Sequence, residues 1–124
     1  PVYDCAKQFA ACDTVVIAAP FWDYSFPAFL KIYIESLCVG GLTFLYGSGG
    51  VPISYCRAKT LIYITTSGGY IGGTDFGFEY IKTVTKSFFG IENFSFFSAE
   101  GLDILGNDPA AILKAAQEKI EREL

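Results

Sequence analysis

Two short apolar runs constrain the fold of this 124-residue chain more than any other feature. Thr14 to Ala19 (TVVIAA) and Thr60 to Thr66 (TLIYITT) are largely apolar, without a clean alternation of apolar and polar residues. That pattern is typical of parallel strands that are covered on both faces. Asn93 to Ala99 (NFSFFSA) predicts a third strand. Parallel strands need long crossover connections, so helices are expected between the three segments.

Helical patterns alternate with the strands. Tyr3 to Ala11 is predicted to be the end of one helix. The next follows Pro27 and stops at the Gly40-Gly41 pair, with apolar residues at intervals of four, three and four: Phe26, Leu30, Tyr33 and Leu37. Another begins near Thr74 or Asp75 and ends at Gly90. The alternating order predicts an α/β protein with a doubly wound parallel sheet.

A last helix is predicted from Asp108, a good N-cap, to the C-terminus, with Pro109 in its first turn. Its spacing predicts a buried face of Leu113, Ala116 and Ile120, with Glu118 and Arg122 paired on the exposed side.

The segment from residue 40 to residue 59 breaks this rhythm, because it contains five glycines and a proline and is long for a simple connection. It is interpreted as a surface loop or a small hairpin. The alternative is a flap over a ligand, or a contact between subunits.

Charge and composition disfavour several classes of protein. Nine basic residues against 13 acidic residues give a net charge of -4, and the basic residues are scattered, so no nucleic-acid partner is expected. The longest apolar run, Val15 to Trp22, is far shorter than the ~20 residues of a membrane-spanning helix, and no signal peptide is visible. We therefore expect no membrane partner.

The chain has no histidine, and its four cysteines form no Cys-x-x-Cys pair. No His-dependent nucleophilic machinery is expected, and no metal site. Free buried thiols in a reducing cytosol are the simplest interpretation, so a cytoplasmic location is predicted. No catalytic side chain stands out, and an enzyme built from this chain would depend on a cofactor.

Ligands of open parallel sheets bind beyond the carboxyl ends of the strands. The first such segment here is Pro20, Phe21, Trp22, Asp23 and Tyr24, which offers flat aromatic surfaces. The second is Thr66, Ser67, Gly68, Gly69 and Tyr70, where glycines leave backbone groups accessible. The alternatives are that the aromatics fill the core, that Asp23 and the glycines only form turns, and that Glu100 anchors a loop.

Five stretches together resemble the FMN-dependent NADH-azoreductase and quinone reductase family. They are CDTVV at 12–16, IAAPFWDYSFPAFLK at 17–31, GLTF at 41–44, ITTSGG at 64–69 and AEG at 99–101. The resemblance covers nearly the whole chain, in order. It implies a flavodoxin-like doubly wound parallel sheet, of which residues 1–124 would be the C-terminal part of a single domain, holding strands three to five with their helices.

The resemblance also implies an activity and a site. FMN would accept electrons from NADH or NADPH and pass two of them to a quinone or azo compound, in a homodimer whose flavin sites lie at the subunit interface. Residues 20–24 would lie along one edge and face of the isoalloxazine ring, and residues 66–70 would hold its pyrimidine side. Two alternatives stay open: a flavodoxin-type electron carrier, and a flavin-free α/β interaction module.

Three departures from the family pattern bear on the site. Asp23 stands where the family usually has Asn. Little changes if its main-chain amide binds the ring, whereas a side-chain contact would disfavour electron density on the reduced ring. Tyr70 is the nearest substitute for a histidine that often follows the Gly-Gly pair. The Ser-rich loop that holds the FMN phosphate at a helix N-terminus is not among these residues. The two strand-end segments would therefore be half of a flavin site.

Overall fold

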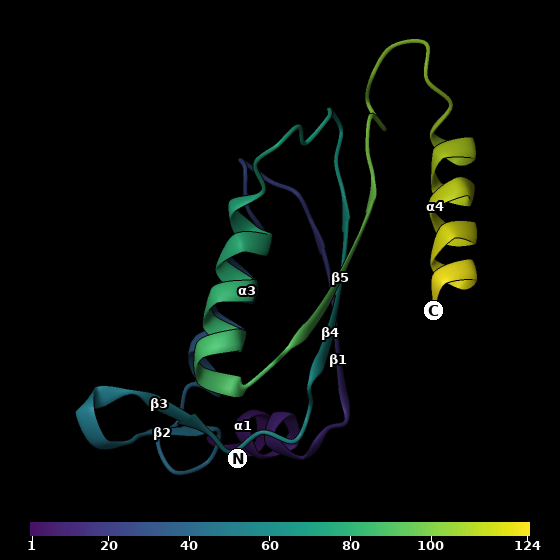
Figure 1. The fold of residues 1–124 in the computed structure, drawn as a ribbon. Helices are drawn as coiled ribbons and strands as arrows, with labels where there is room; N and C mark the ends of the chain where they lie inside the picture. The colour runs from purple at the N-terminus through teal and green to yellow at the C-terminus, as the bar shows by residue number, and fades with distance from the viewer.

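A computed structural model describes residues 1–124, with a three-stranded parallel sheet at its centre (Figure 1). Its strands are β1 (Thr14–Pro20), β4 (Thr60–Thr66) and β5 (Asn93–Ala99), arranged in the order β1-β4-β5. β4 lies in the middle and pairs in parallel with both neighbours. All three predicted strands are confirmed, and β1 is one residue longer than expected. Its last residue is Pro20, which an edge strand tolerates because no ladder hydrogen bond is needed on its open side.

The helices begin and end largely where local sequence signals place them. They are α1 (Asp4–Ala11), α2 (Ala28–Leu37), α3 (Phe76–Phe89) and α4 (Pro109–Glu123). Asp75 caps α3 by accepting a hydrogen bond from the Phe78 backbone N–H (3.0 Å), and Gly90 ends it in a left-handed conformation. Asp108 caps α4 in the same way. α2 ends at Leu37, three residues before the predicted stop at the glycine pair.

The core lies between the sheet and the first three helices. It contains Phe9 of α1, the residues of β1 and β4 that face these helices, and the inner sides of α2 and α3: Val15, Leu61, Tyr63, Ile34, Leu37, Ile81 and Phe89. The predicted inner side of α2 needs one correction, because Ile34 is buried while Tyr33 is 39% exposed. Both positions fit the helical spacing, and the residue without a hydroxyl group takes the place in the core.

α4 stands alone on the other face of the sheet (Figure 1). The prediction that it buries Leu113, Ala116 and Ile120 was wrong: none of its residues is buried, and Leu113 is 46% exposed. A cavity of about 350 Å3 separates this side of the helix from β4 and β5. The exposed ion pair of α4 joins Lys119 to Glu123 rather than Glu118 to Arg122. Helical periodicity identified the apolar side of α4, and the gap to the sheet leaves that side half covered.

The glycine-rich segment from residue 40 to residue 59 contains a small antiparallel hairpin, which is one of the two forms in the main interpretation of the sequence. β2 (Phe44–Tyr46) pairs with β3 (Pro52–Ser54) across a short 3-10 turn, η1 (Ser48–Gly50). Phe44 stacks on Phe88 of α3 at 4.5 Å between ring centroids. The hairpin is thereby fixed to the end of α3 that lies far from the carboxyl ends of the strands (Figure 1).

All four cysteines are free, with Cys5 exposed and Cys56 buried. None of the helices has the length and apolar character that a membrane crossing requires.

Candidate functional site

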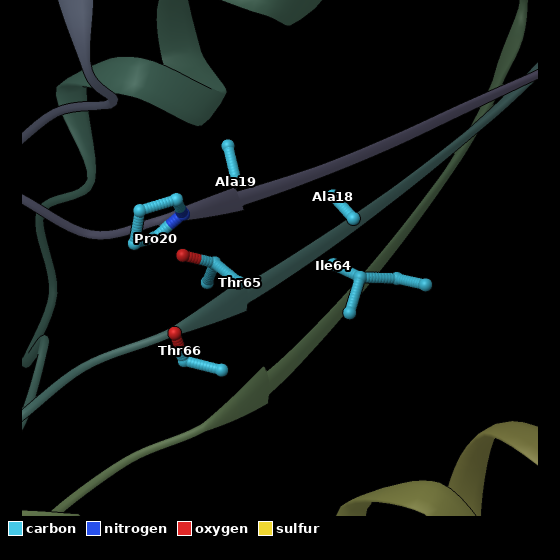
Figure 2. A pocket seen from close by; sticks show the side chains of 6 residues that line it. All are labelled: Ala18, Ala19, Pro20, Ile64, Thr65 and Thr66. Atoms are coloured by element: carbon cyan, nitrogen blue, oxygen red, sulfur yellow. The ribbon is translucent and has the colours of Figure 1, made fainter.

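A cavity of about 330 Å3 opens between the segments that follow β1, β4 and β5. Its walls are Pro20, Phe21, Trp22, Thr66, Ser67, Gly68, Leu102 and Asp103. A second hollow of about 240 Å3 shares Pro20 and Thr66 with it and extends along the strand ends past Ala18, Ala19, Ile64 and Thr65 (Figure 2). The structure therefore brings six of the ten predicted site residues together in one wall, at the edge of the sheet where a ligand is expected.

The segment after β1 is a tight turn. Trp22 and Ser25 exchange two backbone hydrogen bonds of 2.8 and 2.9 Å, and both residues between them have positive φ angles, 52° at Asp23 and 68° at Tyr24. This is the geometry of a two-residue type I′ turn, which favours Asn and Gly. Asp23 is thus a turn residue, as one alternative held, and neither Asp23 nor Tyr24 lines the cavity.

The aromatic side chains of this turn do not fill the core. Trp22 is 58% exposed and Tyr24 is 63% exposed, while Phe21 is half-buried. The rings of Phe21 and Tyr24 meet edge to face at 6.0 Å. Exposed rings at the mouth of a cavity provide flat apolar surface for a planar ligand.

The segment after β4 is held by its own backbone and by the segment after β5. The Ser67 hydroxyl donates to the Gly69 carbonyl (2.7 Å), and the Gly69 carbonyl also accepts from the Gly101 N–H (2.8 Å). The Gly68 carbonyl accepts from the Asp103 N–H at 2.9 Å. Gly69 has no heavy atom within 4 Å of the place a Cβ would take, and its backbone N–H donates to no other group.

Tyr70 is not brought into the cavity wall. Its ring packs against Gly101, and its hydroxyl accepts a hydrogen bond from the Asn107 side-chain amide at 3.2 Å. Two thirds of the side chain is exposed. Tyr70 therefore braces the loop between β5 and α4 instead of facing Phe21 and Trp22.

Glu100 is the loop anchor that one interpretation of the sequence expected. One of its carboxylate oxygens accepts from the Ile71 N–H (2.8 Å), and the other accepts from the Ser98 hydroxyl (2.5 Å). With each oxygen accepting a hydrogen bond, Glu100 joins the glycine-rich loop to the end of β5.

The sequence analysis missed two residues of the cavity, Leu102 and Asp103. Both follow β5 directly, and the rule that ligands bind beyond strand ends applies to this third strand as well. The Asp103 carboxylate lies so close to Gly68 that a Cβ there would overlap Oδ2. No sequence motif signals that contact, because it depends on the parallel pairing of β4 with β5.

Polar groups beneath the cavity are deeply buried. The Thr65 hydroxyl is 2% exposed and has no hydrogen-bond partner, which is rare for a buried polar atom. Two residues earlier on the same face of β4, burial raises the pKa of the Tyr63 phenol, and the nearby charge of Asp75 raises it further. Tyr63 therefore stays neutral, and the Thr65 hydroxyl is an unpartnered polar atom closed off from solvent.

The fold and the cavity define the class of protein. A parallel α/β sheet with a ligand-sized opening between its strand-end loops belongs to the doubly wound type. Residues 2–124 match the family described as having a flavodoxin-like fold, and the chain is a member of that family.

Relatives and solved structures extend the comparison. The chain is 42% identical over 123 residues to the FMN-dependent NADH:quinone oxidoreductase 2 of Clostridium acetobutylicum, covering 95% of this chain and 60% of that protein. It is 35% identical over 126 residues to the FMN-dependent NADH:quinone oxidoreductase of Coprothermobacter proteolyticus, covering 98% of this chain and 62% of the relative. The chain thus spans about three fifths of the length of these curated relatives.

Among solved structures, the chain resembles an FMN-dependent NADH-azoreductase from Bacillus anthracis in complex with FMN. The TM-score is 0.81 at 26% sequence identity, over 98% of this chain and 59% of the other. The azoreductase AzrA gives a TM-score of 0.78 at 28% identity, over 95% and 58% of the two chains.

Proposed function

We propose that this chain is the C-terminal part of a flavodoxin-like domain in an FMN-dependent oxidoreductase. The intact protein takes electrons from NADH or NADPH and passes two of them to a quinone or azo compound. The names of the relatives support the activity, and the azoreductase structure in complex with FMN supports the cofactor. The share of the relatives' length that the chain spans supports the assignment of residues 1–124 to part of a domain.

The observation that carries this proposal is the cavity between the strand-end loops. Its wall combines two aromatic side chains, Phe21 and Trp22, with the loop at Gly68, where the N–H groups of Gly68 and Gly69 have no hydrogen-bond partner. A flavin ring needs apolar surface for its faces and hydrogen-bonding groups for its heteroatoms. These residues fit the ring of FMN.

The cavity wall fits the phosphate of FMN less well than it fits the ring. The cavity wall contains no lysine or arginine, and no helix in it presents an N-terminus to an anion. We therefore assign to this chain the ring-binding half of the site.

FMN, when bound, would accept hydride from the donor and pass the electrons on. The chain's own residues would position the ring and shield it from water. Phe21 and Trp22 limit where a planar group can lie, and the backbone N–H groups of Gly68 and Gly69 offer donors along one edge. The turn at Asp23 is fastened to α3 through the Phe76 N–H, which donates to the Tyr24 carbonyl at 2.9 Å. A fixed frame of this kind lowers the cost of orienting donor and acceptor on the ring.

The activity is tested by stopped-flow mixing of the FMN-loaded intact protein with NADH under anaerobic conditions. We expect rapid bleaching of the flavin absorbance, followed by reoxidation when a quinone is added. A protein that binds FMN without being reduced by NADH would instead be an electron carrier.

The assignment of only the ring-binding half of the FMN site to these residues is tested on the 124-residue polypeptide alone. Without a phosphate grip it should bind FMN weakly, with a Kd above the micromolar range. Titration of flavin fluorescence measures this, and sub-micromolar binding would contradict the assignment of only half a site to these residues.

We also propose that the protein is a homodimer of the cytoplasm. Apolar side chains on the outer side of α2 support the dimer, since Phe29 is 83% exposed and Ile32 is 61% exposed. Leu45 and Ile53, paired across the hairpin, add a second apolar surface. Four free thiols support a reducing compartment. Analytical ultracentrifugation of the intact protein tests the dimer, and Phe29→Glu should shift it toward monomer.

A further inference from the structure

We propose that Asp103 sets the charge of the ring cavity and lowers the reduction potential of FMN bound there. The inference rests on the proposed function, because it concerns how this chain treats the flavin. It assigns the electrostatic role that the sequence suggested for Asp23 to a different carboxylate, one that follows β5.

The position of Asp103 is fixed from two sides. Its backbone N–H donates to the Gly68 carbonyl at 2.9 Å. Its side chain lies over the same glycine, with Cγ 3.1 Å from the place a Cβ of Gly68 would occupy. Any side chain at residue 68 would collide with the carboxylate. The Asp103 carboxylate can therefore occupy this part of the cavity wall only because residue 68 is glycine.

Asp103 is the single charged residue in that wall. The other seven lining residues are apolar, hydroxylated or glycine: Pro20, Phe21, Trp22, Thr66, Ser67, Gly68 and Leu102. The five ion pairs of the chain involve other residues, so no basic group neutralises Asp103. The charge of the wall is accordingly that of one unpaired carboxylate.

The other carboxylates near the strand ends are differently engaged. Asp23 lies in the type I′ turn and does not line the cavity. Glu100 uses both oxygens on Ile71 and Ser98. Asp75 is buried and caps α3. Asp103 alone places a negative charge beside the proposed ring.

Reduction adds electron density to the isoalloxazine ring. A fixed negative charge next to the ring disfavours the electron-rich form and leaves the oxidised form almost unaffected. Asp103 is exposed to solvent at the rim, so water and salt moderate the effect. We expect neutralising it to favour reduced FMN by about tenfold, which corresponds to about 30 mV for a two-electron couple.

The experiment compares FMN-loaded intact protein as wild type, Asp103→Asn, Asp103→Glu and Asp23→Asn. The ratio of oxidised to reduced flavin is measured anaerobically against a reference redox dye, at low and high salt. Asp103→Asn should shift the ratio about tenfold toward reduced flavin, with a smaller shift at high salt. Asp103→Glu should stay within threefold of wild type, and so should Asp23→Asn.

A second measurement separates charge from structure. Fluorescence titration gives the Kd for oxidised FMN, which Asp103→Asn should change less than threefold. The inference is overturned if Asp103→Asn leaves the ratio unchanged, if Asp23→Asn shifts it equally, or if affinity for oxidised and reduced FMN falls in parallel. An intact protein that takes up no FMN would refute the proposed function itself, and the inference with it.

Discussion

Gly101 lies where the loops after β4 and β5 meet, and replacing it should disrupt both. Its φ angle is +77°, a left-handed conformation that costs other residues about 1–2 kcal/mol. A Cβ at this position would lie 2.9 Å from the Tyr70 ring and 2.9 Å from the Asn107 amide. Crowding of this kind costs a further 1–3 kcal/mol or so. Gly101→Ala should therefore lower the free energy of unfolding by about 2–5 kcal/mol.

Gly106 provides a matched control within the same loop. Its φ angle is +91°, and nothing lies within 4 Å of the place its Cβ would take. Gly106→Ala should therefore cost only the conformational part, about 1–2 kcal/mol. The two costs differ by the packing of Tyr70 and Asn107 on Gly101.

Urea unfolding followed by circular dichroism measures both variants against the parent chain. Adding Asn107→Ala to Gly101→Ala should recover part of the loss, because one of the two colliding groups is removed. Equal costs for Gly101→Ala and Gly106→Ala would refute the reasoning, since they would mean that Tyr70 and Asn107 do not pack on Gly101.

Further predictions concern the cap of α3 and the thiols. Asp75→Ala removes the cap and should lower the free energy of unfolding by about 1 kcal/mol. Asp75→Asn keeps an acceptor for the Phe78 N–H and avoids burying a charge with an unpartnered oxygen. Urea unfolding should therefore place Asp75→Asn within about 0.5 kcal/mol of the parent. Iodoacetamide should modify exposed Cys5 first and buried Cys56 last, as mass spectrometry of the alkylated peptides would show. Burial raises the pKa of the Cys56 thiol to about 11, from about 9. The unfolded chain therefore loses this proton first, and stability should decline as the pH rises from about 9 to about 11. The decline should be shallower in Cys56→Ala, and an equal decline in both proteins would exclude this thiol as a contributor.

The sequence was sufficient for the parallel strands and for most helix ends, and the reason is local. Continuous apolar runs such as Thr60 to Thr66 require cover on both faces, and residues such as Asp75 and Gly90 act on their own helix. Burial of α4 could not be predicted in the same way. Its periodicity gives the direction of the apolar side but not the distance to the sheet, and Leu113 consequently lies beside a cavity.

The site residues also differ in how far local sequence determines where they lie. Residues directly behind β1 and β4 could be assigned, because a strand end fixes where its next few residues lie. Tyr70 is farther along, and its place depends on Gly101 and Asn107 in another loop. Asp103 was missed because its contact with Gly68 joins segments that are distant in the chain. The positive φ angle at Tyr24 also carries no signal in the sequence, since Asp is a common choice for that turn but Tyr is not.

Backbone atoms make most of the connections among the three strand-end loops. The Phe21 N–H donates to the Thr66 carbonyl (2.7 Å), the Ser67 N–H donates to the Ala99 carbonyl (2.9 Å), and the Leu102 N–H donates to the Ser67 carbonyl (3.1 Å). A mutation at any of these residues, proline apart, leaves such a bond available. The shape of the pocket is thereby insulated from most point mutations, while its charge and surface chemistry can change one residue at a time. Substitutions in the cavity wall can therefore change which ligand the cavity accepts while the backbone frame of the three loops stays in place.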